Sequence, residues 1–166
     1  PPITTQQVTY ESADGTEVRM FIISKAGEPS GPRPTILYGY GGFGLPLTPG
    51  FSATVLSWVE AGGIWAVAGL RGGGEEGEQW HRDGMLGNKQ NVFDDFAACL
   101  RWLAASGWTR PARIGISGRS NGGLLVGATI TQHPELFGAA VAEVGVMDML
   151  RFHQFTIGWG WTSDYG

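Results

Sequence analysis

One serine lies in the sequence pattern of an activated nucleophile. Residues 118–122 read Gly-Arg-Ser-Asn-Gly and match G-x-S-x-G, with Ser120 at the centre. A short apolar run at 113–117 precedes the pattern, and a run without proline from Asn121 to about Gln132 follows it. A strand, a sharp turn and a helix in this order expose a serine hydroxyl above a sheet, and the N–H groups that begin the helix stabilise negative charge beside it. We therefore predict that Ser120 is the nucleophile of an acyl transfer, rather than part of a merely glycine-rich turn.

Tyr40 can supply a second part of the same chemistry. It lies in the glycine-rich segment 39–44, directly after a predicted strand that should neighbour the strand before Ser120. A phenol there can donate to the oxyanion that forms on the attacked carbonyl in the transition state. The residues alone also allow a tyrosine that packs through its ring and leaves its hydroxyl in water.

Segments 39–44 and 72–77 both fit the dinucleotide-binding pattern G-x-G-x-x-G. In such a site a helix begins at the glycines and presents its N-terminus to the pyrophosphate. Prolines at 46 and 49 disfavour a helix after the first segment, and residues 80–84 are a poor opening for a helix after the second. The two glutamates of the second segment would also repel a diphosphate. We therefore expect no nucleotide cofactor.

The elements that must position these residues follow from the apolar pattern. Alternation on either side of the turn Asp14-Gly15 predicts a β-hairpin from Gln7 to Ser24. Short apolar runs predict strands at 35–38, 64–70, 113–117 and 139–144. Helical spacing and caps predict helices at 52–61, 93–104 and 121–132, with a loop at 27–34 and a short helical segment at 149–154. Apolar strands joined by helices predict a mostly parallel sheet with helices on both faces and functional loops at the carboxyl ends of the strands.

Composition limits the possible functions. The chain has 166 residues, of which 42% are hydrophobic, and this suits one domain or part of one. Its net charge of −4 comes without a lysine and arginine cluster, so we expect no nucleic acid as a partner. It has neither a long apolar run nor a leader-like start, so we expect no membrane partner. The single cysteine, Cys99, lies on the apolar side of a predicted helix, and we expect it in the core.

Six segments resemble the prolyl oligopeptidase family of serine peptidases in order and spacing. They are 38–43, 71–75, 88–91, 118–123, 144–150 and 161–166, and the likeness spans essentially the whole chain. The resemblance implies an α/β-hydrolase fold and a serine endopeptidase, cytoplasmic or alternatively periplasmic, that hydrolyses short peptides on the carboxyl side of proline. It also implies that no metal and no cofactor takes part.

The resemblance further implies roles for eight residues. Ser120 would be the nucleophile, and the backbone N–H of Asn121 and the hydroxyl of Tyr40 would form the oxyanion hole. Trp161 would stack against the substrate proline, and the rest of the pocket wall would come from Phe43, Val144, Val146 and Tyr165. An apolar pocket edged by aromatic rings suits a pyrrolidine ring that offers no N–H, although the same residues taken alone also fit ordinary core packing.

Two positions depart from the family pattern. Glu76 stands where the family often has tyrosine, and Arg119 stands where it often has glycine. Neither touches the chemistry assigned above. An arginine next to Ser120 would favour acidic peptides.

The chain offers no good candidate for the base that activates Ser120. In α/β-hydrolases the carboxylate and the histidine of the triad follow the serine. His133 ends the helix after Ser120 and is too far away, His153 lies in the short helical segment, and His81 precedes the serine.

The resemblance places the missing aspartate and histidine beyond Gly166 and a propeller domain before Pro1. We therefore expect residues 1–166 to be the N-terminal and central part of a peptidase catalytic domain, inactive without the remainder. The alternatives are another α/β-hydrolase, such as an esterase or acylaminoacyl-peptidase, or a catalytically dead fragment that only binds peptides.

Overall fold

The sheet begins with the predicted hairpin. The computed structural model describes residues 2–25 and 31–166, so part of the loop expected at 27–34 lies outside the described residues. Strands β1 (Thr4–Glu11) and β2 (Glu17–Ser24) pair antiparallel along their whole length. Gly15 takes φ 83° at the turn, which is the left-handed conformation that glycine adopts without strain. The Asp14-Gly15 turn is thus confirmed.

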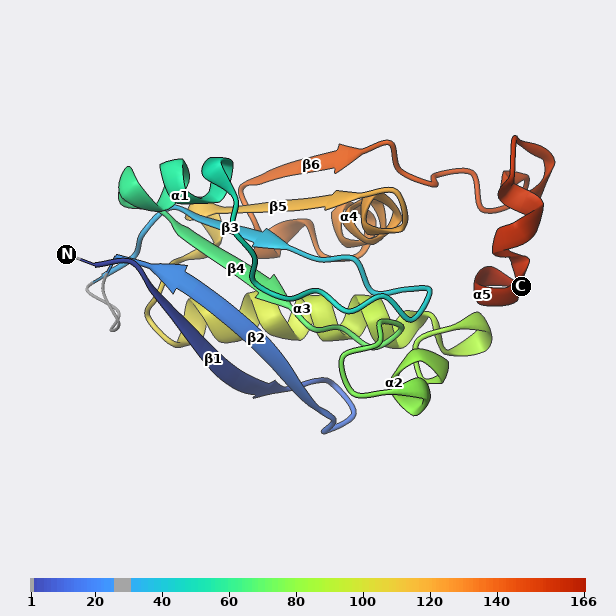
Figure 1. Ribbon diagram of the computed structural model, residues 1–166, viewed down its shortest axis with the longest axis horizontal. Coiled ribbons are helices and arrows are strands. Elements are labelled where there is room, and N and C mark those ends of the chain that lie inside the picture. The colour runs from blue at the N-terminus through green and yellow to red at the C-terminus, as the bar shows by residue number, and fades with distance from the viewer. Residues whose placement is uncertain (1, 26–30) are drawn as a thin grey trace.

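The remaining strands extend the sheet in the order β1-β2-β4-β3-β5-β6 (Figure 1). Strand β4 (Ile64–Ala68) runs antiparallel to β2, whereas β3 (Thr35–Tyr38), β5 (Ile114–Arg119) and β6 (Ala139–Glu143) continue in parallel. Strand β3 lies between β4 and β5, so the loops that follow β3 and β5 meet at one edge of the sheet. This is the edge at which ligands bind in open α/β sheets.

Helices cover the sheet on both sides, as Figure 1 shows. Helix α1 (Ala53–Glu60) lies on one face, and α3 (Gln90–Ala105) and α4 (Asn121–Gln132) lie on the other. The Ser52 hydroxyl accepts a hydrogen bond from the Val55 N–H at 3.3 Å and caps α1, as its sequence position predicts. The short helix α5 (Thr162–Tyr165) lies near the C-terminus, away from the sheet.

One expectation about the second glycine segment was wrong. Residues 80–84 look like a poor helix opening, yet α2 (Glu78–Arg82) forms there. Its N-cap, Gly77, has φ 94° and makes no side-chain capping bond. The buried Trp80 ring holds the helix in place, because its Nε1–H donates to the carbonyl oxygens of Gly69 at 3.2 Å and Leu70 at 3.0 Å. Tertiary packing has overridden a weak local signal.

The hydrophobic core lies between the sheet and α3. Met20 of β2 and Phe96 and Leu100 of α3 are fully or almost fully buried in it. Cys99 is buried in the same cluster with its Sγ 3.2 Å from the sulfur of Met20, so it is a core residue as expected. In the part of the chain that the structure describes, none of the helices combines the length and the apolar character needed to cross a membrane.

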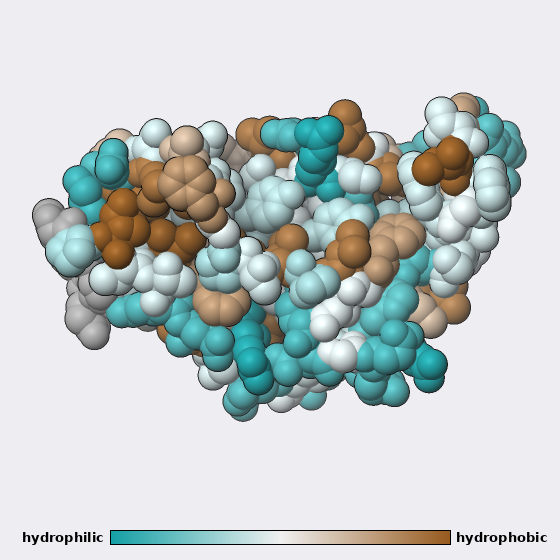
Figure 2. All heavy atoms as spheres, in the orientation of Figure 1, coloured by the Kyte–Doolittle hydropathy of each residue, from teal (hydrophilic) through white to brown (hydrophobic). Residues whose placement is uncertain are grey.

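The opposite face of the sheet is incompletely covered near β6. Every residue of β6 is exposed or half-buried, and Val141 retains 55% of its accessible surface. A groove of about 510 Å³ runs beside α1 over β3, β5 and β6, with Ile36, Trp58 and Trp65 among its apolar lining residues. Figure 2 shows apolar side chains gathered at the surface around the α1 end of the molecule.

Candidate active site

The turn at Ser120 is held by close backbone contacts at two glycines. Ser120 has φ 58° and ψ −113°, a conformation that costs an L-residue about 1–3 kcal/mol. A Cβ on Gly118 would overlap the carbonyl oxygen of Gly122, and one on Gly122 would lie 2.5 Å from the carbonyl oxygen of Gly39. The Ser120 N–H donates to the Glu143 carbonyl at 2.9 Å and ties the turn to β6. The predicted succession of strand, sharp turn and helix is confirmed.

The surroundings of Ser120 suit developing negative charge. Ser120 directly precedes α4, whose first N–H groups have no acceptor within the helix and carry partial positive charge. Tyr40 comes from the loop after β3, the strand next to β5, and lines the same cavity as Ser120. Burial raises the pKa of Tyr40, so its phenol keeps its proton and can donate.

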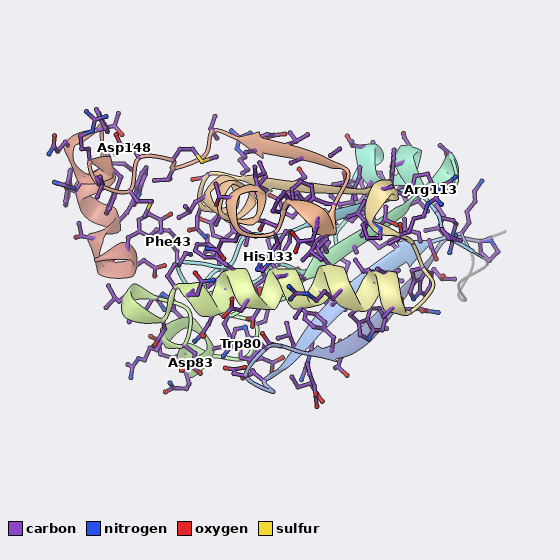
Figure 3. All side chains as sticks on the ribbon, turned by 180° about the vertical axis from the view of Figure 1, so that it is seen from behind. Phe43, Trp80, Asp83, Arg113, His133 and Asp148 are labelled. Carbon is purple, nitrogen blue, oxygen red and sulfur yellow. The ribbon has the colours of Figure 1, made fainter. Side chains whose placement is uncertain are left out.

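A small cavity of about 160 Å³ opens beside Ser120. The residues that line it are Tyr40, Phe43, Leu45, Ser120, Val146, Trp161 and Tyr165. Phe43 and Tyr165 meet edge to face with 5.4 Å between ring centroids, and Figure 3 shows Phe43 between the α5 segment and helices α3 and α4. The structure therefore brings together all the pocket residues implied by the resemblance except Val144. Leu45 joins them without any signal in the sequence patterns considered above.

Val144 lies outside this cavity. The residue is 70% exposed and lines a neighbouring cavity of about 320 Å³, which shares only Val146 and Trp161 with the first. The backbone of Val144 has φ 39° at the end of β6, where the chain leaves the sheet. A contact between Val144 and substrate remains a prediction.

The Asn121 side chain joins the segments around the cavity. This residue is buried, and its Nδ2–H donates to the Tyr40 carbonyl at 2.8 Å. Its Oδ1 accepts from the Tyr165 hydroxyl at 2.8 Å and from the Lys89 ammonium at 3.0 Å. The resemblance implies a role only for the backbone N–H of Asn121. Asn121 lies 32 residues from Lys89, so no local pattern indicates this contact.

A buried carboxylate and a histidine hold the C-terminal wall of the cavity. Asp164 of α5 is buried, with one oxygen 2.5 Å from His81 Nε2 of α2. Its other oxygen accepts from the Phe43 N–H at 3.2 Å. The pair fixes α5, which carries Tyr165, to α2, and the Phe43 bond fixes it to the loop after β3. It joins residues 83 positions apart, and sequence reasoning considered His81 only as a catalytic base.

None of the histidines is hydrogen-bonded to the Ser120 hydroxyl within residues 2–25 and 31–166. His81 pairs with Asp164, and His133 Nδ1 lies 3.4 Å from Glu135. His153 is exposed and packs its ring against Phe152. The same described residues include no group of three potential metal ligands. In the described residues, the Ser120 hydroxyl is therefore exposed to the cavity without a histidine base beside it.

A sequence profile described as the prolyl oligopeptidase family matches residues 49–166. The chain belongs to this family. The prolyl endopeptidase of Elizabethkingia miricola is 52% identical over 163 residues, which cover 98% of this chain and 23% of that protein. Prolyl oligopeptidase A of Galerina marginata (strain CBS 339.88) is 50% identical over 163 residues, covering 96% of this chain and 22% of that protein.

Solved structures of prolyl oligopeptidases share the fold. Prolyl oligopeptidase B from Galerina marginata, as the apo protein, superposes with a TM-score of 0.95 at 46% identity, covering 99% of this chain and 24% of that one. A post-proline cleaving enzyme from Rickettsia typhi superposes with a TM-score of 0.95 at 40% identity, with the same coverage of 99% and 24%. The α/β-hydrolase fold and the family resemblance are thus confirmed. The chain spans about a quarter of the length of these prolyl oligopeptidases.

The two departures from the prolyl oligopeptidase pattern lie outside the cavity beside Ser120. The Arg119 side chain is 67% exposed and lies 3.5 Å from Glu143. Glu76 pairs with Arg19 at 2.8 Å and does not line the cavity. A preference for acidic peptides therefore remains a prediction that rests on the position of Arg119 in the sequence.

Proposed function

We propose that residues 1–166 form the N-terminal and central part of the catalytic domain of a serine endopeptidase that cleaves short peptides on the carboxyl side of proline. One observation carries the proposal: a serine in a strained turn at a helix start faces a small cavity lined by four aromatic rings. The names of the relatives, prolyl endopeptidase and prolyl oligopeptidase, support the reaction and the substrate class. By resemblance to the family, we also propose a cytoplasmic or periplasmic location.

The proposed reaction proceeds through an acyl-enzyme. The Ser120 oxygen attacks the carbonyl carbon of the substrate proline, and a C–O bond forms while the carbonyl π electrons move onto the oxygen. The Asn121 N–H and the Tyr40 hydroxyl would hold this oxyanion. The C–N bond then breaks, the amine leaves with the proton taken from Ser120, and water releases the peptide acid. We propose that a histidine outside residues 1–166 carries that proton and that an aspartate there orients the histidine, so the fragment alone is expected to be inactive.

The cavity suits the substrate side chain. The Trp161 indole and the Phe43 and Tyr165 rings would surround a pyrrolidine ring, which is apolar and has no N–H to satisfy. Burial raises the pKa of Tyr165, and its hydroxyl donates to Asn121, so Tyr165 brings no charge to the pocket. An esterase would use the same serine on esters, whereas a fragment that only binds peptides would not need the serine hydroxyl, so both would respond differently in the test below.

Ser120→Ala in the full-length protein tests the proposal. We expect loss of labelling by a fluorophosphonate probe and turnover of a chromogenic Gly-Pro substrate near background, because no other group could form the acyl-enzyme. Ser163→Ala, at an exposed serine of α5, is the matched control and should leave both unchanged. Labelling that persists without Ser120 would refute the nucleophile. Turnover of simple esters but not of the Gly-Pro substrate would favour the esterase.

A further inference from the structure

The Lys89 side chain connects the two loops that carry the proposed oxyanion donors. Lys89 lies just before α3, and its ammonium donates to the Gly41 carbonyl at 2.8 Å and to Asn121 Oδ1 at 3.0 Å. Gly41 follows Tyr40 in the loop after β3, whereas Asn121 follows Ser120 at the start of α4. The ammonium also lies 5.5 Å from the centroid of the Tyr165 ring, on the third segment of the cavity.

Lys89 and the Tyr40 carbonyl together fix the direction in which the Asn121 amide faces. An ammonium can only donate, so the atom of Asn121 that meets Lys89 must be the oxygen. The amide nitrogen then faces the Tyr40 carbonyl, to which it donates at 2.8 Å. The Tyr165 hydroxyl cannot impose this direction, because a hydroxyl can donate or accept. The Tyr40 carbonyl can only accept and favours the same direction, so removing Lys89 leaves Asn121 Oδ1 facing the Tyr165 hydroxyl, a group that can also turn and accept.

The loop after β3 has little room to adapt. A Cβ on Gly41 would overlap the side chain of Val92 on α3, and one on Gly42 would overlap the Asn121 amide nitrogen. Lys89 thus contacts two successive carbonyls of this loop. It donates directly to the Gly41 carbonyl, and it reaches the Tyr40 carbonyl through the Asn121 amide. The position of the Tyr40 phenol relative to the Asn121 N–H depends on these contacts.

We propose that Lys89 is a positioning residue for the oxyanion hole. It acts through Asn121 and the Tyr40–Gly41 carbonyls and does not touch the reacting atoms. The inference rests on the proposed function of Ser120. Burial disfavours the charged form of Lys89 and lowers its pKa to about 8, whereas the nearby Asp164 carboxylate opposes this shift. At neutral pH Lys89 therefore still carries the proton that both acceptors need.

Lys89→Met in the full-length protein removes the ammonium and keeps an unbranched apolar chain. We expect kcat to fall about 10-fold to 100-fold with KM changed little, because a displaced oxyanion donor weakens the transition state more than the bound substrate. Lys25→Met is the matched control, since Lys25 also donates to a carbonyl, that of Glu60 at 2.6 Å, far from the cavity. Rates are expressed per Ser120 titrated by fluorophosphonate, which corrects for unfolded protein.

A pair of inhibitors separates positioning from general loss of structure. A peptide aldehyde ending in prolinal adds to the Ser120 oxygen and places an oxyanion in the hole, whereas the corresponding alcohol only occupies the pocket. In Lys89→Met the Ki of the aldehyde should rise by the same factor as kcat/KM falls, while the Ki of the alcohol stays within about twofold. Lys89→Leu, which also removes the donor, provides the same comparison if the methionine variant does not fold.

A double-mutant cycle tests the route through Asn121. Asn121→Ala keeps the backbone N–H and removes the amide, so Lys89→Met should reduce kcat by a smaller factor in that background than in the native one. Equal factors in both backgrounds, or an unchanged ratio of aldehyde to alcohol Ki in Lys89→Met, would overturn the inference while Ser120-dependent turnover leaves the proposed function intact. Turnover that survives Ser120→Ala would overturn both.

Discussion

Asp95→Asn should strongly weaken the attachment of the hairpin to the rest of the fold. Asp95 of α3 is fully buried and accepts hydrogen bonds from Arg71 Nη2 at 2.7 Å, from the Arg71 N–H at 3.0 Å and from the Ser12 hydroxyl at 2.5 Å. Arg71 is 3% exposed and also pairs with Asp14 in the hairpin turn at 2.6 Å. The carboxylate therefore links α3, the hairpin and the glycine loop after β4.

The magnitude follows from the burial of the two partners. Removing one member of a buried ion pair costs about 3–5 kcal/mol, because the other charge stays buried without its partner. Asp14 still contacts the Arg71 guanidinium, so we expect the lower end, about 3 kcal/mol. The control is Asp14→Asn: the Asp14 side chain is 49% exposed, and an exposed pair contributes about 0–1 kcal/mol. The Arg71 guanidinium lowers the pKa of Asp14, but solvent screening limits what this contributes to stability.

Hydrogen exchange of the β1 and β2 amides in the full-length protein measures this difference locally. A loss of about 3 kcal/mol should speed their exchange about 100-fold in Asp95→Asn, whereas Asp14→Asn should change it by less than about fivefold. Amides of α4, which lies outside the network, serve as the internal reference. Equal and small effects of the two substitutions would show that the buried carboxylate contributes no more than a surface pair, and the reasoning would fail.

Two further predictions concern the cavity. Tyr40→Phe keeps the ring and removes one donor, so kcat should fall by about 10²–10³ with KM changed little, and an unchanged kcat in steady-state assays would return Tyr40 to a packing role. Trp161→Ala should reduce kcat/KM for a proline substrate by about 1–3 kcal/mol more than for its alanine analogue, and equal losses would place the proline pocket elsewhere.

The parts of the fold that the sequence predicts are those with local physical signals. The hairpin turn, the Ser52 cap and the glycine turn around Ser120 each depend on residues a few positions apart. Gly107, with φ 86°, ends α3 where the pattern expects a glycine. Helix α2 escaped prediction because the buried Trp80 holds it by contacts from outside the helix.

The candidate site divides in the same way. Ser120 and Tyr40 could be found because each lies in a short glycine motif after a strand, and the sheet order then brings them to one cavity. Lys89 contacts Asn121 across 32 positions of sequence, and His81 contacts Asp164 across 83. Neither periodicity nor motif spacing predicts contacts over such separations. Val144 shows the converse, because a family pattern supplies residue types but not the direction that φ 39° gives the chain.

Close backbone packing at the glycines gives the site a rigid centre, and the long-range polar contacts give it a less constrained wall. Around Ser120 the backbone is so closely packed that a Cβ at position 118 or 122 would overlap a neighbouring carbonyl oxygen. The segment that carries Trp161 and Tyr165 lies beyond the sheet in Figure 1 and is fastened to the rest of the site by a few polar contacts, through Asp164 and the Tyr165 hydroxyl. Breaking one of those contacts should therefore change which residue the cavity accepts before it changes how Ser120 is presented.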